Sequence, residues 1–450
     1  MIIHCCDNVE IHEDGHKYAL TAISPGENII KYGMPIGCAC REIKKGEHVH
    51  THNVKTNLSG LLEYEYTPDF QIPEIHCDRT FMGYARPDGQ AGIRNELWVI
   101  PTVGCVNHLA QLLAQSCGGI ALTHPYGCSQ LGSDHEMTAE LLAALVRNPN
   151  AGGVLVVGLG CENNTLASFR ERLGDISNLN IRFLLAQEPG DELAKGKALL
   201  QELEAAKVKE RTEIPVSELR VGLKCGGSDG FSGLTANPLV GRFSDWLIRQ
   251  GATSVLTEVP EMFGAETLLM NRCIDREVFD KCVAMINDFK AYYERYGQVI
   301  YENPSPGNKD GGITTLEDKS LGCVQKGGSA PVVDVLAYGE RLKRPGLNLI
   351  TAPGNDLVAS TVLAAAGCQL ILFTTGRGTP YGSVVPTLKI ATNTLLAKNK
   401  PHWIDFDAMA NGSMEDLADL VLKTASGEIQ TCNEIHGHRE IAIFKDGVTL

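Results

Sequence analysis

The sequence predicts an α/β protein in which a small N-terminal β domain is followed by two α/β domains with parallel sheets. Two observations support this prediction. Short, turn-rich segments at the start give way to strand-like runs that alternate with helical ones, and 450 residues are too many for one compact core. We expect the small β domain at residues 1–60, a linker at 61–79, and α/β domains at 80–210 and 211–450.

The first part of the chain consists of short segments separated by turns. A Ser24-Pro-Gly turn follows one segment, Gly33 interrupts another, and His48-Val-His-Thr-His closes the run. Short strands between glycine and proline turns are typical of a small β domain. The acidic, proline-containing stretch Glu63–Asp78 then predicts a linker.

From about Arg79 onward, strand-like and helical runs alternate, which indicates βαβ units and parallel sheets covered on both faces. The charged stretch Glu202–Glu218 predicts the break between the two halves, and the Gly- and Lys-rich stretch Pro304–Pro331 predicts a functional loop. The predicted strands are Leu97–Val103, Gly119–Thr123, Gly153–Leu159, Ile181–Ala186, Leu219–Leu223, Ser254–Val259, Leu347–Ala352 and Leu370–Thr375. The predicted helices are His108–Ser116, Met137–Val146, Asp191–Ala206, Pro238–Arg249, Asp356–Ala366 and Thr387–Lys398.

Composition and charge exclude several classes of function. The formal net charge is −14, whereas a protein that binds a phosphate backbone needs a basic face. The N-terminus lacks the pattern of a secretory signal, and the most apolar stretch, Gly152–Cys161, is too short to span a bilayer. We therefore expect a cytoplasmic protein that binds neither nucleic acid nor membrane. An odd total of 15 cysteines argues against a disulfide framework, so some of them are candidate metal ligands.

Cys128, Cys161 and Cys225 share one setting, a glycine-flanked position just past a predicted strand. Ligands of open α/β sheets bind beyond the carboxyl ends of the strands, so these thiols are candidate ligands of one metal. Three ligands would leave a position open for a substrate, and thiolates suit zinc, copper(I) and iron–sulfur clusters. For any one of them alone, a small residue tolerated at a tight junction is the alternative. Three cysteines in less distinctive settings are expected to be structural: Cys105, Cys323 and Cys368.

His50 and His52 close the predicted β domain. Residues at alternate positions of a strand point to the same face, so this pair is a candidate for binding a metal or a carboxylate. A polar strand edge would show the same pattern.

Three later loops combine glycines with polar side chains. Ser228 and Asp229 lie in Cys225-Gly-Gly-Ser-Asp-Gly, whose N–H groups can form an anion nest, and Lys309 lies in Pro306-Gly-Asn-Lys. Arg377 and Thr379 follow a predicted strand, and arginine binds carboxylates with a bidentate fork. Ordinary loop chemistry is the alternative for each, but the combination favours substrate binding. The glycine spacing of residues 376–382 misses the dinucleotide fingerprint, which disfavours an NAD(P)-dependent oxidoreductase.

Several long motifs resemble the altronate/galactarate dehydratase family, and together they cover nearly the whole chain. The segment that ends in His50-Thr-His-Asn resembles the SAF-type β domain at the front of these enzymes. The other motifs are Phe81-Met-Gly-Tyr-Ala-Arg-Pro-Asp-Gly, Gly92-Ile-Arg-Asn-Glu, Ile100-Pro-Thr-Val-Gly-Cys, His124-Pro-Tyr-Gly-Cys, Gly158-Leu-Gly-Cys-Glu-Asn-Asn, Lys224-Cys-Gly-Gly-Ser-Asp-Gly-Phe-Ser-Gly, Pro306-Gly-Asn-Lys, Thr375-Gly-Arg-Gly-Thr-Pro-Tyr-Gly and Arg439-Glu-Ile-Ala-Ile-Phe-Lys.

The resemblance implies an iron(II)-dependent hydro-lyase that converts a hexonate or hexarate into a 2-keto-3-deoxy sugar acid. The iron would be mononuclear or part of a cluster, the substrate a small anionic sugar acid, and the enzyme a homo-oligomer. Candidates for the general base and acid are His50, His52, His124 and Lys309. The alternatives are a sulfolactate-type sulfo-lyase and a sugar-acid-binding protein without catalytic activity.

Overall fold

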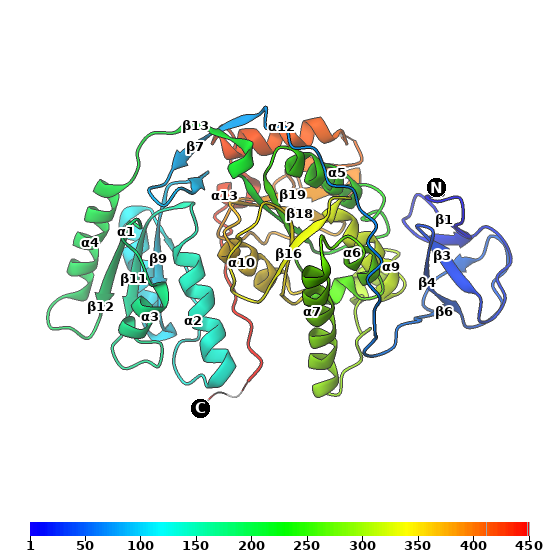
Figure 1. The fold of residues 1–450 in the computed structure, drawn as a ribbon, viewed down its shortest axis with the longest axis horizontal. Coiled ribbons are helices and arrows are strands. Elements are labelled where there is room, and N and C mark those ends of the chain that lie inside the picture. Colours follow the sequence, from blue (N-terminus) through cyan, green and yellow to red (C-terminus); the bar gives the residue numbers. More distant parts are fainter. Residues whose placement is uncertain (411, 448, 450) are drawn as a thin grey trace.

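The computed structural model describes residues 1–410, 412–447 and 449. It confirms the predicted fold class: a small β domain is followed by two units that are each built on a parallel sheet (Figure 1). None of the described helices combines the length and the apolar character needed to cross a membrane.

The N-terminal domain consists of two three-stranded antiparallel sheets. Isoleucines from its strands and turns, among them Ile23, Ile29, Ile36 and Ile43, are fully buried between them. The first sheet has the order β1 (Val9–Ile11), β2 (Lys17–Ala19) and β5 (His48–Val49), and the second has the order β3 (Asn28–Lys31), β4 (Met34–Ala39) and β6 (Val54–Lys55).

The predicted linker forms no helix or strand, but it lies along the C-terminal unit instead of hanging free (Figure 1). Tyr64 Oη donates to Glu266 at 2.6 Å, and Tyr66 Oη donates to the carbonyl of Cys273 at 2.7 Å. The chain then enters a small antiparallel sheet that connects the two α/β units. Its strands have the order β13 (Thr212–Pro215), β7 (Thr80–Ala85) and β8 (Ala91–Gly92).

The first α/β unit is a four-stranded parallel sheet covered by helices. Its strands are buried apolar runs, as a sheet covered on both faces requires. The strand order is β10 (Ile120–Ala121), β9 (Glu96–Pro101), β11 (Ala151–Gly158) and β12 (Ile181–Leu185), and the helices are α1 (Asn107–Cys117), α2 (Gly132–Val146), α3 (Leu166–Leu173) and α4 (Glu192–Ala206).

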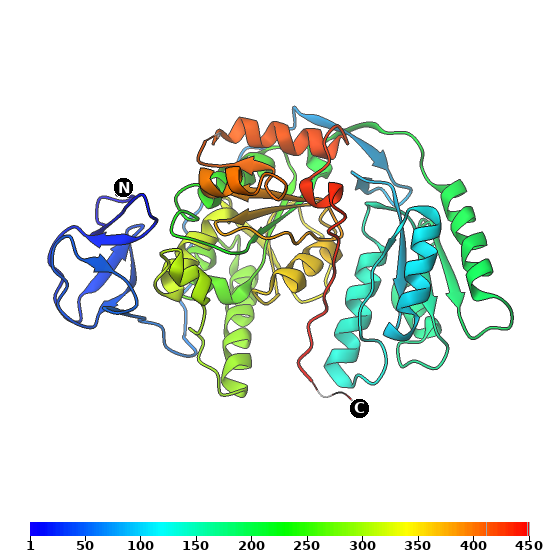
Figure 2. The ribbon, with the colours of Figure 1, turned by 180° about the vertical axis from the view of Figure 1, so that it is seen from behind.

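The second α/β unit is a seven-stranded parallel sheet. Its strands have the order β16 (Val332–Leu336), β17 (Gly346–Ile350), β15 (Thr253–Leu256), β14 (Arg220–Cys225), β18 (Leu370–Thr375), β19 (Thr387–Ala391) and β20 (Phe406–Asp407). Its helices are α5 (Ala236–Arg249), α6 (Glu266–Met270), α7 (Arg276–Arg295), α8 (Pro306–Asp310), α9 (Leu316–Cys323), α10 (Asp356–Ala366), α11 (Thr394–Asn399), α12 (Met414–Ala425) and α13 (Cys432–Ile435). The chain after α13 returns between the two units, where Ala442 N donates to Thr361 and Asp446 N donates to Asp134 (Figure 2).

The strand order places a topological switch point between β14 and β18. The chain proceeds from β14 to β15 on one side of β14, and later strands continue from β18 on the other side. Ligands of open parallel sheets bind in the crevice at such a point, beyond the carboxyl ends of the strands. The loops after β14 and β18 carry Ser228, Asp229, Arg377 and Thr379.

Two predicted elements of the second unit are wrong. Residues 387–398 were expected to form one helix, but they form β19 followed by α11, because all five residues of β19 are buried in the sheet. Periodicity alone does not separate a short buried strand from a buried helical segment. Residues 304–331 were expected to form a loop, but they include α8 and α9. Helix α9 contains three charged residues, yet all eight of its residues are buried.

Candidate active site

The loops after β14 and β18 are held together through their backbones. Gly226 N donates to the carbonyl of Thr374 at 3.0 Å, and Arg377 N donates to the carbonyl of Gly227 at 2.9 Å. Gly227 has φ +62°, and a Cβ on it would lie 3.2 Å from Cβ of Arg377. A glycine at this position therefore lets the two loops approach each other and places Arg377 at the switch point.

The carboxylate of Asp229 helps to hold the two loops in this arrangement. Its buried carboxylate accepts hydrogen bonds from Thr392 Oγ1 at 2.9 Å, Asn393 Nδ2 at 3.0 Å and Ser232 Oγ at 3.1 Å. Burial raises the pKa of this carboxyl, and the hydrogen bonds oppose that shift. Asp229 was predicted to bind substrate, but these hydrogen bonds show that it stabilises the loops. The hydroxyl of Ser228 is buried and has no hydrogen-bond partner among the described residues.

A groove with a volume of about 640 Å³ opens between these loops and the N-terminal domain. Arg377 lines it with an exposed guanidinium that makes no ion pair or hydrogen bond within the described part of the chain. The carboxylates of Glu13, Asp14 and Asp310 line the same groove, and so does Lys400, whose ammonium lies 4.5 Å from the centre of the Trp403 ring. One free guanidinium together with several hydrogen-bond acceptors suits a ligand that has one carboxylate and many hydroxyl groups.

Thr379 and Lys309 lie near this groove in different roles. Thr379 is bound within its own loop, because its hydroxyl accepts from Tyr381 N at 3.2 Å and its carbonyl accepts from Lys389 Nζ at 2.8 Å. Lys309 is half-buried on the short helix α8, and its ammonium group makes no hydrogen bond in the described residues. Lys309 is therefore available to a substrate, whereas Thr379 shapes the loop.

The N-terminal domain contributes a cluster of imidazoles to the interface. His50 Nδ1 lies 3.1 Å from Thr314 Oγ1 of the C-terminal unit, and His16 Nδ1 lies 3.0 Å from His48 Nε2. The rings of His48 and His50 are 5.4 Å apart. Burial and the nearby ammonium of Lys17 lower the pKa of His50 to about 4, so its ring is neutral at pH 7 and can accept a proton.

The predicted pairing of His50 with His52 on one strand is wrong. Strand β5 ends at Val49, so both histidines lie in the turn that follows it. His52 is exposed, and its ring stacks on His48 with the centroids 5.5 Å apart. Sequence reasoning missed His16 and His48, although the alternate-residue run His48-Val-His-Thr-His was a signal for His48.

His124 does not belong to this site. It is buried in the first α/β unit, where Nε2 donates to the carbonyl of Pro101 at 2.8 Å and Nδ1 accepts from Tyr126 N at 3.2 Å. Burial lowers its pKa to about 4. Because both ring nitrogens are bound to backbone groups, the prediction of a catalytic role for His124 is corrected to a structural one.

The three predicted metal ligands do not converge either. Cys128 and Cys161 lie in neighbouring loops at the carboxyl edge of the four-stranded sheet, where Asn164 N donates to the carbonyl of Gly127. Cys225 ends β14 in the seven-stranded sheet. Among the described residues, no group of possible metal ligands within 4.8 Å of one another contains Cys128 or Cys161. The sequence placed all three at strand ends, but the strands belong to two different sheets.

Cys225 instead lies beside Cys323, which was expected to be structural. Their sulfurs are 3.3 Å apart, and both thiols approach Glu261 Oε2, at 3.1 Å from Cys225 and 3.2 Å from Cys323. All three side chains are buried. Cys323 ends α9 and Glu261 lies in a 3-10 helix after β15, so three separate segments form this thiol–carboxylate cluster.

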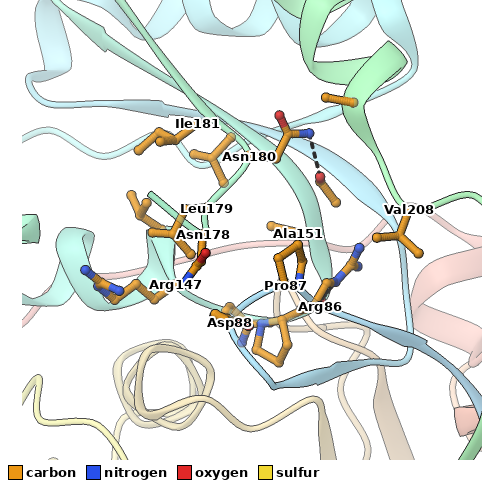
Figure 3. A pocket seen from close by; sticks show the side chains of 16 residues that line it. Arg86, Pro87, Asp88, Arg147, Ala151, Asn178, Leu179, Asn180, Ile181 and Val208 are labelled. Carbon is orange, nitrogen blue, oxygen red and sulfur yellow. Dashed lines mark hydrogen bonds between the residues drawn. The ribbon is translucent and has the colours of Figure 1, made fainter. Parts of the chain in front are cut away.

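A further cavity, of about 60 Å³, lies at the opposite, amino-terminal edge of the four-stranded sheet (Figure 3). Arg86 extends into it, and its guanidinium donates to the carbonyl of Pro149 at 2.8 Å, the carbonyl of Arg94 at 2.7 Å and the side chain of Asn95 at 2.8 Å. These bonds occupy the guanidinium and fix the β7–β8 hairpin to the sheet, so the cavity is structural.

Comparison with known proteins assigns all three parts of the chain. Residues 3–57 match the altronate/galactarate dehydratase SAF domain, residues 83–207 match the second domain of D-galactarate dehydratase/altronate hydrolase, and residues 216–449 match the C-terminal domain of D-galactarate/altronate dehydratase.

The matches to curated relatives cover nearly the full length of this chain. The chain is 56% identical to altronate dehydratase of Bacillus subtilis (strain 168), over 98% of this chain and 94% of that protein. It is also 56% identical to altronate dehydratase of Escherichia coli (strain K12), over 97% of this chain and 92% of that protein. Galactarate dehydratase (L-threo-forming) of the same Escherichia coli strain is 33% identical, over 97% of this chain and 91% of that protein. With its three domains matched in order, the chain belongs to the D-galactarate/altronate dehydratase family of sugar-acid hydro-lyases.

Proposed function

We propose that this enzyme dehydrates an altronate-like hexonate to a 2-keto-3-deoxy sugar acid, with iron(II) as its cofactor and in the cytoplasm. The observation that carries the choice of substrate is the charge of the groove. Arg377 offers a free guanidinium and Lys400 offers an ammonium that lies over the ring of Trp403, whereas Glu13, Asp14 and Asp310 offer three carboxylates. A hexonate has one carboxylate and several hydroxyl donors, which matches this distribution. A hexarate would place its second carboxylate near like charges.

The side chains at the interface support proton transfer at C2 of such a substrate. Arg377 binds the substrate carboxylate and shares the negative charge that develops when the neighbouring C–H bond breaks. His50 is neutral and hydrogen-bonded to Thr314, so it is oriented to accept the C2 proton. Lys309 has a free ammonium group and can donate a proton to the departing C3 hydroxyl. The enol that results then tautomerises to the ketone.

The described residues contain donors that fit iron. Cys225, Cys323 and Glu261 combine soft thiols with a carboxylate on the β14 side of the switch point, and iron accepts both ligand types. When bound, iron(II) would supply a Lewis acid that polarises substrate oxygens. Fifteen cysteines without a disulfide suit the reducing cytoplasm.

An anaerobic screen of the iron-loaded enzyme against hexonates, hexarates and sulfolactate tests this proposal. We expect 2-keto-3-deoxy products, with kcat/KM highest for a hexonate. Release of sulfite from sulfolactate would identify a sulfo-lyase instead. Binding of sugar acids without any product would identify a binding protein.

Substitution of Arg377 should mainly affect substrate binding. A hydrogen bond to a charged group contributes about 1.5–3 kcal/mol, so Arg377→Gln should raise KM by about 10- to 100-fold. Arg377→Lys should recover only part of this loss, because an ammonium lacks the bidentate fork. Initial rates across substrate concentration give both parameters. Arg276→Gln, on the exposed face of α7, is the control, and an unchanged KM in Arg377→Gln would remove Arg377 from the site.

A further inference from the structure

The thiol–carboxylate cluster of Cys225, Cys323 and Glu261 is compact and buried. Each of the three donor atoms lies within 3.3 Å of the other two. A sulfur–sulfur distance of 3.3 Å is well beyond the roughly 2.05 Å of a disulfide, so the thiols face each other without a covalent bond. Two sulfurs and one carboxylate oxygen pointing at a common centre form a partial coordination shell for a transition metal.

The charges around the cluster are arranged for a divalent cation. Lys319 Nζ lies 2.8 Å from Glu261 Oε1, and Lys326 Nζ lies 3.3 Å from Glu258 Oε2. Lys224 pairs with both Glu258 and Asp356. Three ammonium groups therefore balance three carboxylates. Two thiolates would add two negative charges, which one divalent ion neutralises in a buried site where uncompensated charge is costly.

The backbone at the cluster is strained in a way typical of functional sites. Glu258 is a buried, non-glycine residue with φ +71° and ψ +59°, in the left-handed region. Its carboxylate accepts from Cys225 N at 3.0 Å and from two of the lysines, which fixes the end of β14. Pairing with Lys224 and Lys326 thus holds Glu258 in this conformation and orients Cys225.

Two buried hydroxyls, each three residues from a cysteine of the cluster, lack hydrogen-bond partners within the described residues. Ser228 follows Cys225 by three residues, and Ser320 precedes Cys323 by three residues on α9, on the same face of that helix. Buried polar groups are normally bound, so these two hydroxyls are available to a polar ligand.

We propose that Cys225, Cys323 and Glu261 bind a divalent transition metal, and that Cys128 and Cys161 do not. Lys224, Lys319 and Lys326 hold the surrounding carboxylates and keep the site neutral once the metal is bound. The identification of this metal as iron depends on the proposed dehydratase function, but the binding of a metal by these three residues does not.

Anaerobic titration of the full-length apoprotein with cobalt(II) tests the site without substrate. We expect one equivalent per chain and a thiolate-to-cobalt charge-transfer band in the near ultraviolet. Cys225→Ser, Cys323→Ser and Glu261→Gln should each weaken binding by at least about 100-fold, the upper end of the loss seen for a second-shell partner. In the wild type, bound cobalt should protect Cys225 and Cys323 from alkylation, which mass spectrometry detects independently of any variant.

Matched controls separate this site from other thiols. Cys282→Ser changes a buried thiol that lies near Cys273, and the Cys128→Ser/Cys161→Ser variant changes the pair in the first α/β unit. Cys5→Ser/Cys6→Ser removes the exposed His4–Cys5–Cys6 group, which could also bind cobalt. All three control variants should keep the band and the stoichiometry.

Cobalt binding without a thiolate band, or loss of the band in any control variant, would overturn the proposal. So would alkylation of Cys225 and Cys323 at the same rate with and without cobalt. If the band and protection appear but no sugar acid is dehydrated, the metal site stands and the proposed function fails. If the enzyme dehydrates a sugar acid but Cys225→Ser binds cobalt as tightly as the wild type, the function stands and this metal site fails.

Discussion

Replacing His50 by glutamine should lower kcat by about 10²- to 10⁴-fold, the range that a positioned general base contributes, while KM changes little. Glutamine can keep a hydrogen bond to Thr314 but cannot accept the C2 proton. A substrate deuterated at C2 should then show a larger primary isotope effect than with the wild type, because proton removal becomes more strongly rate-limiting. A purely structural role for His50 would not change the isotope effect.

The pH dependence gives a second measure of the same role. Burial and the ammonium of Lys17, with smaller contributions from His48 and His16, lower the pKa of His50 to about 4, and Asp318 opposes them. The ring is therefore able to accept a proton above about pH 4, and kcat/KM should fall as the pH decreases through that value. The His50→Gln variant should lack this acid limb.

His76→Gln is the control for this substitution, because His76 is exposed on the segment between the domains and its ring pairs with the exposed Glu74. It should retain the activity of the wild type. If His50→Gln keeps more than about a tenth of kcat, the proton acceptor is another group, and Lys309 is the next one to replace.

Replacing Asp318 by asparagine should destabilise the protein by about 3–5 kcal/mol, the cost of removing one partner from a buried ion pair. Asp318 is fully buried on α9 and accepts from Lys17 at 2.7 Å and Lys31 at 2.8 Å, both in the N-terminal domain. These two ammonium groups hold the pKa of Asp318 well below its usual range. Without the carboxylate, two buried lysines would face each other unpaired, and the N-terminal domain should detach first.

Urea denaturation measures the loss of stability, and limited proteolysis of residues 58–79 reports detachment of the N-terminal domain. Lys17→Met should cost less than Asp318→Asn, because it leaves the matched pair of Lys31 and Asp318. Asp419→Asn, which breaks an exposed pair with Arg79, should cost less than about 1 kcal/mol. Equal losses in Asp318→Asn and Asp419→Asn would show that the buried triad does not hold the domains together.

The strands of the two parallel sheets were predictable because they are apolar and nearly continuous. The run Leu370–Thr375, for example, coincides with β18, and the switch point then follows from the order of such strands. Arg377 and the loops around it were identified for the same reason, since they directly follow these strands.

The rest of the site depends on contacts between distant segments that no local pattern encodes. Asp318 pairs with Lys17, 301 residues away in the sequence, and this pairing makes a charged segment a buried helix. The position of Cys323 beside Cys225 was not foreseen because its helix was expected to be a loop. Cys128 and Cys161 were expected to converge with Cys225 because a strand end does not reveal to which sheet the strand belongs.

Helix α9 connects the N-terminal domain to the Cys225–Cys323–Glu261 cluster. Its eight residues carry the carboxylate that receives the N-terminal domain, the lysine that holds Glu261, and Cys323. A shift of this helix should therefore move both the histidines of the N-terminal domain and the sulfurs of Cys225 and Cys323. If the N-terminal domain detached, His50 and the Cys225–Cys323 pair should be disturbed together, and activity should be lost in one step.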